Sequence, residues 1–430
     1  MKRPTPLIAA LLALGACAYP YTPPALPAAT APAMSPERRA PVTILVSIDG
    51  FRADYLARGL TPRLAQLAQG GVTGPMLPSF PSKTFPNHWT LVTGLVPDRH
   101  GIVANKMEDV RRPGETFTMA TDDPFWWNGA EPIWVTAERA GVRTATVSWP
   151  GSNVGWGGTL TKGENHDLPV GGARPSDWQL FAKALTGAQR VDAVIDWLRR
   201  PVATRPRFVT LYFDTVDTAG HDAGPDSAAV NAALAEVDRS IGQLLDALAV
   251  LGQPANLVIV ADHGMAATSS ARAVALDRVA NPADYRVLET GPYASLYPVA
   301  GHEAALARAL LRPQPHMTCW RKAAIPARFR YGTNPRVPPY LCLAEVGWSI
   351  EKTTPTRVTA GGNHGYDNQS VEMRALFVAN GPAFRAGVTL RPFPNTDVAP
   401  LLRDLLGLPA GTGLDGDDAP FRGALKQEGR

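Results

Sequence analysis

Three uninterrupted apolar runs, each followed by an aspartate, constrain the fold of this 430-residue chain more than any other feature of its sequence. They cover residues 41–48, 208–213 and 256–261 and are rich in β-branched and aromatic side chains, which favour strands. A strand that is apolar on both faces belongs to a parallel sheet that helices cover on both sides. Amphipathic segments at 60–70 and 228–251 alternate with the runs. The pattern predicts an α/β fold with a doubly wound, mostly parallel central sheet.

The first residues of the chain indicate export. Lys2 and Arg3 precede a short apolar run at 7–14, which is too short to span a bilayer as a helix. The run ends in Leu14-Gly15-Ala16-Cys17, which resembles a bacterial lipobox, a motif whose cysteine is lipidated. An ordinary secretory signal that is cleaved nearby is the alternative. In both cases the mature protein is expected in the periplasm, either free or held at the outer membrane by a lipid on Cys17.

The composition along the chain sets the expected domain boundaries. We expect three parts: a signal peptide at 1–16, a Pro- and Ala-rich tether at 17–40 and a catalytic domain at 41–425. Within the domain, residues 266–360 lose the strand–helix alternation, so we expect a cap-like insertion there. The insertion holds Cys319 and Cys342, and two cysteines in an exported protein are expected to form a disulfide.

The charge balance argues against a nucleic-acid scaffold. The chain has 42 Lys and Arg against 38 Asp and Glu, a net charge of +4. Lys2 and Arg3 lie in the segment that is expected to be removed. No broad basic surface of the kind that binds nucleic acid follows from this composition.

Acidic and imidazole side chains gather after the predicted strands. Since the carboxyl ends of parallel strands meet at one edge, where open α/β sheets bind ligands, we expect these side chains to converge. Oxygen and nitrogen ligands without thiolate suit zinc. Six of them with one hydroxyl suit two ions about 4 Å apart, a pair that binds the attacking and the leaving oxygen at phosphorus. The candidate ligands are Asp49, Asp217, His221, Asp262, His263 and His364.

The Pro-rich stretch 79–88 resembles a turn that presents a nucleophile. It delivers the hydroxyl of Thr84 to the start of a short predicted helix at 89–94. Free N–H groups and the positive end of the helix dipole favour an oxyanion at such a position. Taken alone, a threonine before a helix is usually only a cap. The carboxylates and imidazoles elsewhere in the chain are what favour the nucleophile.

Five motifs in order resemble the nucleotide pyrophosphatase/phosphodiesterase family of the alkaline phosphatase superfamily. They are Ser47-Ile48-Asp49-Gly50-Phe51-Arg52, Lys83-Thr84-Phe85-Pro86-Asn87-His88, Asp217-Thr218-Ala219-Gly220-His221, Ala261-Asp262-His263-Gly264-Met265 and Gly362-Asn363-His364-Gly365-Tyr366. The resemblance covers roughly residues 41–425 and implies an alkaline phosphatase-like fold.

The resemblance also implies roles for individual residues. It assigns one Zn²⁺ to Asp217, His221 and His364, and a second Zn²⁺ to Asp49, Asp262, His263 and the Thr84 oxygen. Asn105 and the Phe85 N–H match the groups that bind a non-bridging phosphate oxygen. The expected activity is hydrolysis of nucleotide phosphodiester or pyrophosphate bonds, such as conversion of a nucleoside triphosphate to the monophosphate and pyrophosphate, through a threonyl-nucleotidyl intermediate.

Aromatic residues near these motifs are candidates for stacking a nucleotide base. Phe85 and Tyr212 stand at motif positions, and Trp178 or Phe181 can close the other side, although packing in the core or a loop would explain the last two equally well.

A choline-type glycerophosphodiesterase on the same metal core is the main alternative, and it needs an aromatic cage for a quaternary ammonium. Trp126, Trp127 and Trp156 are available for such a cage. A metal-free binding protein on the same scaffold is disfavoured, because every matched ligand position is intact.

Overall fold

The computed structural model describes residues 38–161, 163 and 168–426. The expected signal peptide, the lipobox with Cys17 and nearly all of the tether lie outside the described residues, so they stay predictions. By contacts the chain divides into Met1–Arg38 and Arg39–Arg430, and the second unit contains every helix and strand described below. Within the described ranges, no helix is both long enough and apolar enough to cross a membrane.

The described residues form a central nine-stranded sheet with the order β20-β2-β19-β10-β1-β9-β5-β8, and β21 also pairs with β2. Its strands are β1 (Val42–Ile48), β2 (Val72–Leu77), β5 (Thr144–Val147), β8 (Asp177–Gln179), β9 (Phe208–Phe213), β10 (Ala255–Val260), β19 (Ala375–Asn380), β20 (Val388–Thr389) and β21 (Phe393–Pro394). Every pairing is parallel except those of β19 with β10 and β2. The predicted mostly parallel sheet is confirmed.

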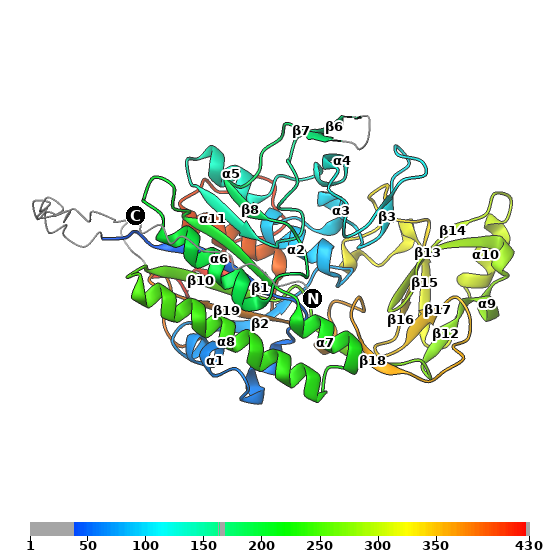
Figure 1. The fold of residues 1–430 in the computed structure, drawn as a ribbon. Coiled ribbons are helices and arrows are strands. Elements are labelled where there is room, and N and C mark those ends of the chain that lie inside the picture. The colour runs from blue at the N-terminus through cyan, green and yellow to red at the C-terminus, as the bar shows by residue number, and fades with distance from the viewer. Residues whose placement is uncertain (1–37, 162, 164–167, 427–430) are drawn as a thin grey trace, which may run out of the picture. The chain divides into compact units, whose positions relative to one another are not determined.

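Helices pack in two groups around this sheet (Figure 1). One group contains α1 (Pro62–Gln69), α6 (Gly187–Arg199), α7 (Thr215–Ala223) and α8 (Ala228–Val250). The other contains α2 (Thr84–Thr93), α3 (Pro97–His100), α5 (Ile133–Arg139) and α11 (Val398–Leu406). Every residue of β1 and β9 is buried, which requires that both faces of the sheet be covered. The doubly wound arrangement therefore follows from the apolar runs.

Residues 266–360 form a lobe with a sheet of its own, which Figure 1 shows apart from the central sheet. The lobe contains β11 (Ala266–Ser269), β12 (Ala273–Ala275), α9 (Leu276–Val279), β13 (Tyr285–Glu289), β14 (Tyr293–Pro298), α10 (Glu303–Leu310), β15 (Met317–Arg321), β16 (Tyr340–Ala344) and β17 (Ser349–Glu351), and it ends at β18 (Ala360–Asn363). An antiparallel four-stranded sheet, β13-β14-β16-β15, covers an apolar cluster of its own. Cys319 and Cys342 are direct partners on β15 and β16 and form the predicted disulfide.

Shorter elements connect these layers. They are β3 (Met107–Glu108), β4 (Thr116–Phe117), α4 (Pro124–Trp127), β6 (Thr159–Thr161) and β7 (Leu168–Val170), with 3-10 turns of which η1 (Ala53–Arg58) and η6 (Asn395–Asp397) are two. The segment 149–178 contains the β6–β7 hairpin and most of β8.

The helix that was predicted at 89–94 begins five residues earlier, at Thr84. Pro86 is its third residue, where an N–H would have no partner inside the helix, so proline does not interrupt it. Thr84 therefore lies in the first turn of α2 rather than in a loop before it.

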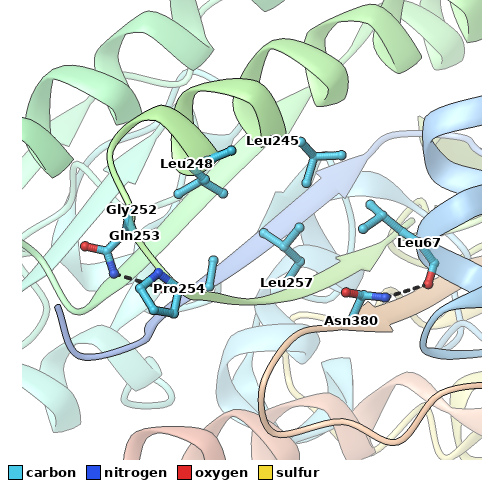
Figure 2. A pocket seen from close by; sticks show the side chains of 10 residues that line it. Leu67, Leu245, Leu248, Gly252, Gln253, Pro254, Leu257 and Asn380 are labelled. Atoms are coloured by element: carbon cyan, nitrogen blue, oxygen red, sulfur yellow. Dashed lines mark hydrogen bonds between the residues drawn. The ribbon is translucent and has the colours of Figure 1, made fainter. Parts of the chain in front are cut away.

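A shallow apolar hollow lies at the opposite end of β10 from Asp262 (Figure 2). It is lined mainly by Leu67, Leu245, Leu248, Pro254 and Leu257. Its two side-chain amides already donate to backbone oxygens, Gln253 to Pro254 and Asn380 to Leu67, both at 2.9 Å. The hollow therefore presents no reactive group, and the chemistry belongs at the carboxyl end of the strands.

Candidate active site

The predicted ligands and nucleophile meet at the carboxyl edge of the central sheet. Their positions are Asp49 after β1, Asp217 and His221 in α7 after β9, Asp262 and His263 after β10, His364 after β18, and Thr84 at the start of α2. The chain leaves the central fold for the lobe just after His263 and returns just before His364. The β11–β18 pair, which opens and closes the lobe, therefore brings these two histidines together.

One cluster surrounds His263. Its Nε2 lies 3.0 Å from Oδ2 of Asp262, 3.4 Å from Oδ1 of Asp49 and 3.3 Å from the Thr84 hydroxyl oxygen. Asp49, Asp262 and His263 are all nearly or completely buried. The cluster thus joins two carboxylates, one imidazole and one hydroxyl, and His263 also lies with its donor atom within 4.8 Å of those of Asp217 and His364.

A second cluster surrounds Asp217. Its Oδ1 lies 3.4 Å from Nε2 of His221 and 3.6 Å from Nε2 of His364, and the two histidine nitrogens are 3.1 Å apart. The rings of His263 and His364 stack with their centroids 3.5 Å apart. The two clusters are therefore neighbours in one site.

Backbone carbonyls fix the tautomer of all three histidines. Nδ1 of His221 lies 2.9 Å from the Gly362 oxygen, and Nδ1 of His263 lies 2.9 Å from the Gly264 oxygen. Nδ1 of His364 lies 2.8 Å from a third carbonyl, that of residue 82. Because a carbonyl only accepts, each Nδ1 carries the proton and each Nε2 lone pair faces the site. This is the second-shell arrangement that metal-binding histidines ordinarily show.

The carboxylates of the site have the properties of ligands for a cation. One buried oxygen of each aspartate, Oδ1 of Asp49, Oδ1 of Asp217 and Oδ2 of Asp262, lacks a hydrogen-bond partner among the described residues. Burial, and then the neighbouring carboxylates, raise the pKa of Asp49 and Asp262 well above the ordinary value. Charged oxygens in such a place are costly unless a cation meets them. The residues present therefore fit a metal centre.

His88 lies close to these ligands but is not one of them. Its donor atoms, with those of Asp49 and Asp262, fall within 4.8 Å of one another. However, Nδ1 of His88 donates to the Thr84 carbonyl at 2.8 Å, and Nε2 pairs with the Ser47 hydroxyl at 2.9 Å. With both nitrogens engaged, His88 fastens α2 to β1 and leaves no lone pair for a metal. Its spacing of four residues from Thr84 is the signal that could have revealed this role.

The turn before Thr84 is held by Asn87, a residue that the sequence did not single out. Its Nδ2 donates to the carbonyls of Pro81 and Lys83 at 2.9 and 2.8 Å. Its Oδ1 accepts from the Ser79 N–H and from Nδ2 of Asn395, both at 2.8 Å. One buried amide thus satisfies four partners and sets the direction in which Thr84 leaves the turn.

Asn105 lies beside the nucleophile, where the resemblance implied a phosphate contact. The Phe85 N–H donates to its Oδ1 at 3.0 Å. Its Nδ2 makes no hydrogen bond to any described residue, so this uncharged donor is free to meet a phosphate oxygen. The Phe85 N–H itself is occupied by Asn105 in this state.

Comparison with known proteins agrees with this geometry. A family model described as type I phosphodiesterase/nucleotide pyrophosphatase matches residues 43–367. The chain belongs to this family. It is a nucleotide pyrophosphatase/phosphodiesterase, and the family depends on metal ions.

Two relatives and a solved structure are similar to this chain over most of their own length. The bis(5′-adenosyl)-triphosphatase enpp4 of Xenopus laevis is 37% identical over 373 residues, covering 86% of this chain and 78% of the relative. A pyrophosphatase/phosphodiesterase of Schizosaccharomyces pombe, itself uncharacterized, is 37% identical over 409 residues, covering 89% and 79%. Human ectonucleotide pyrophosphatase/phosphodiesterase 5 has a similar structure, with a TM-score of 0.82, 32% identity and coverage of 90% of this chain and all of that one. An inactive threonine-to-alanine variant of its murine counterpart, solved with AMP, matches equally well.

Two of the predicted base-stacking residues of this phosphodiesterase are buried. Phe85 is 1% exposed, and its ring packs against Phe117, Trp127 and Phe181. Tyr212 is 3% exposed, and its hydroxyl donates to Asp49 at 2.6 Å. Both rings are therefore buried in this structure, so stacking of a base on either of them stays a prediction.

The other two aromatic candidates differ in position. Phe181 is half-buried and contacts the rings of both Phe85 and Tyr212, which places it near Thr84 and Asp49. Trp178 is exposed on β8, with the Arg174 guanidinium 5.9 Å from its ring. Phe181 is the better placed of the two.

The choline-type alternative loses its aromatic cage. Trp126 and Trp127 are buried in the core, and Trp156 is half-buried with the Arg139 guanidinium 5.4 Å from its ring. A cation already lies against the one indole that is partly exposed. These three residues therefore do not form a site for a quaternary ammonium.

Proposed function

We propose that this phosphodiesterase uses two zinc ions and Thr84 to cleave nucleotides through a threonyl-nucleotidyl intermediate. Asp217, His221 and His364 would hold one ion. The other would be held by Asp49, Asp262, His263 and the Thr84 oxygen. The observation that carries the proposal is the set of unpartnered carboxylate oxygens and Nε2 lone pairs that face one another around Thr84.

When bound, the two ions would supply Lewis acidity, which favours the ionised Thr84 hydroxyl and stabilises charge on the leaving oxygen. Thr84 itself forms the new bond from Oγ1 to phosphorus while the bond from phosphorus to the leaving oxygen breaks, and that oxygen keeps the electron pair. Asn105 Nδ2 would donate to a non-bridging oxygen. Attack by water then breaks the bond to Oγ1 and returns the Thr84 hydroxyl.

The proposed substrates are nucleotides that carry a 5′-phosphoryl group in a diester or anhydride, including nucleoside triphosphates and dinucleoside polyphosphates. Two relatives support this choice: one is named a bis(5′-adenosyl)-triphosphatase, and the structure of another contains AMP. Both involve an adenosine 5′-phosphoryl group. The uncharged donor of Asn105 suits a phosphorus centre with a single negative charge.

A substrate panel tests the proposal. Purified protein is incubated with ATP, diadenosine triphosphate and glycerophosphocholine, and products are separated by chromatography. We expect AMP and pyrophosphate from ATP, and AMP and ADP from diadenosine triphosphate. Release of ADP and orthophosphate from ATP would refute cleavage at the α-phosphorus. A higher kcat/KM for glycerophosphocholine than for either nucleotide would refute the substrate class.

We also propose that the protein acts outside the cytoplasm and is anchored through a lipid on Cys17. The charged start, the short apolar run and the lipobox-like motif support this. Cell fractionation tests it: the wild type should follow the membrane fraction, and Cys17→Ala should become soluble. A wild type found entirely in the soluble periplasmic fraction would favour simple signal cleavage.

A further inference from the structure

Lys83, directly before Thr84, carries a buried ammonium that has no hydrogen-bond or ion-pair partner among the described residues. Its side chain is 7% exposed, and among the described residues its Nζ makes neither a hydrogen bond nor an ion pair. The side chain of Lys83 runs beside Gly365, the residue after His364, and its Nζ lies 3.3 Å from the position that a Cβ on Gly365 would take. The charge of Lys83 acts on Asp217 and His364 and also on His263. The ammonium therefore lies next to His364, on the side of the Asp217 cluster.

A carboxylate from the lobe faces this ammonium. Glu289 ends β13 at an irregularity in its pairing with β14, and the Tyr293 hydroxyl donates to its Oε2 at 2.6 Å. Lys83 Nζ lies 5.8 Å from the centroid of the same tyrosine ring. Burial raises the pKa of Glu289, and the charges of Lys83 and then Lys106 oppose that rise. Glu289 is thus close enough to both lysines to act through space, yet it does not bind the ammonium of Lys83.

The two lysines flank the residues that act on the phosphoryl group. Lys83 precedes Thr84, and Lys106 follows Asn105. In the proposed function the Thr84 oxygen belongs to the other ligand set, so the ion that Asp217, His221 and His364 would hold is the one that would meet the leaving oxygen. The charge around Lys83 therefore falls on the leaving-group side, where an unpaired ammonium attracts a polyphosphate and a nearby carboxylate opposes it.

We propose that Glu289 is a specificity-determining residue that limits the preference for highly charged leaving groups. The inference rests on the proposed function and adds to it a determinant of substrate choice outside the ligand set. Because Lys83 is buried and Glu289 is half-buried, salt screens their effect less than it screens surface charges. The Tyr293 hydroxyl binds the Glu289 carboxylate, and among the described residues no carboxylate pairs with the ammonium of Lys83, whose field Glu289 reduces through space.

Two substrates that share adenosine separate leaving-group charge from base recognition. ATP releases pyrophosphate, and adenosine 5′-(p-nitrophenyl phosphate) releases a singly charged phenolate. Glu289→Gln keeps an acceptor for Tyr293 and removes the charge. We expect kcat/KM for ATP to rise ~3- to 10-fold, as for loss of one nearby charge, while kcat/KM for the ester changes less than ~2-fold.

A double-mutant cycle shows whether Glu289 acts through Lys83. In a Lys83→Gln background, Glu289→Gln should no longer raise the rate with ATP. Glu345→Gln, which removes an exposed lobe carboxylate paired with His316, is the matched control and should leave both substrates unchanged. Glu289→Ala and melting temperatures guard against a folding defect in one variant.

The outcomes are distinct. Equal changes with both substrates, or no change with ATP, would overturn the role of Glu289 and leave the proposed function intact. An unchanged Glu289→Gln effect in the Lys83→Gln background would overturn the route through Lys83. A wild type that cleaves neither substrate would refute the proposed function, and the inference with it.

Discussion

The hydroxyl of Tyr212 donates a 2.6 Å hydrogen bond to Oδ2 of Asp49, the carboxylate whose other oxygen has no partner. The bond fixes the Asp49 carboxylate and directs the unpartnered Oδ1 toward His263, 3.4 Å away. A residue that seemed a base-stacking platform from the sequence is therefore a support for a candidate metal ligand.

Tyr212→Phe separates these two roles, because it keeps the ring and removes only the hydroxyl. If Tyr212 orients Asp49, metal affinity should fall by roughly 10- to 100-fold, as for loss of other second-shell partners. The KM for nucleotide at saturating zinc should change little. Metal titration of the apo-protein measures the first quantity. Unchanged metal affinity would refute the supporting role.

Removing the metal should abolish activity and lower thermal stability. Without a cation, three buried carboxylate oxygens lack partners, and their desolvation is not compensated. Elemental analysis should find two zinc ions per chain. Dialysis against a chelator should lower the melting temperature, and zinc should restore both stability and activity. Full activity with one ion or none would refute the two-metal assignment.

Thr84→Ala should reduce turnover at least about a thousandfold, because it deletes the nucleophile and leaves only the remaining machinery. The fold should persist, since the residue before the helix makes no side-chain cap and the turn is held by Asn87. Thr84→Ser should keep part of the activity. Rapid quenching should trap a labelled covalent adduct in wild type and none in Thr84→Ala. Comparable rates for both proteins would exclude a covalent role.

The central fold could be predicted from the sequence because its main strands carry mostly apolar side chains on both faces. Residues 42–48 and 208–213 are buried throughout, so no alternation had to be interpreted. The sequence also predicted that Asp49, Asp262 and His263 converge, since a parallel sheet aligns the ends of its strands. Residues that follow parallel strands lie together because of the sheet topology. The local hydrophobic pattern of the sequence is enough to predict that topology.

Other features depend on contacts between distant segments and were beyond the sequence pattern. The burial of Phe85 results from packing against Phe117 of β4 and Phe181, which come from separate segments of the chain. The hydrogen bond of Asn87 to Asn395 spans more than 300 residues. The lobe has its own sheet and apolar cluster, yet its short strands showed no regular alternation with helices. In each case the partner, not the local sequence, determines the role.

Asp397 predicts a pH dependence of stability outside the active site. Burial raises its pKa to about 7, above the unfolded value of about 3.9. The folded state then binds a proton that the unfolded state releases, so the stabilisation is complete below about pH 4 and is lost as pH rises through 7. Asp397→Asn stays neutral and should exceed the wild type in stability, by about 1–4 kcal/mol at pH 8 and by less at pH 5.

Denaturant titrations at the two pH values measure this difference. Asp196→Asn, which changes an exposed carboxylate, is the control and should show no such trend. If the wild type is as stable as Asp397→Asn at pH 8, ionisation of the Asp397 carboxyl does not lower the free energy of unfolding, and the prediction is wrong.

Phe181 is expected to carry the base selectivity. Its ring is partly exposed and contacts the rings of Phe85 and Tyr212. Phe85 follows Thr84 in the chain, and the Tyr212 hydroxyl binds Asp49. Stacking on one ring is worth roughly 1–3 kcal/mol, so Phe181→Ala should raise KM for ATP by about fivefold to a hundredfold. A base-free diester such as bis(p-nitrophenyl) phosphate should be cleaved almost as before.

Trp178→Ala is the matched control, because that ring is exposed on β8 and has no contact with the site residues among those described. Equal losses with nucleotide and base-free diester would show that Phe181 only packs the site. A larger effect of Trp178→Ala than of Phe181→Ala would place the base on the outer face of β8 instead.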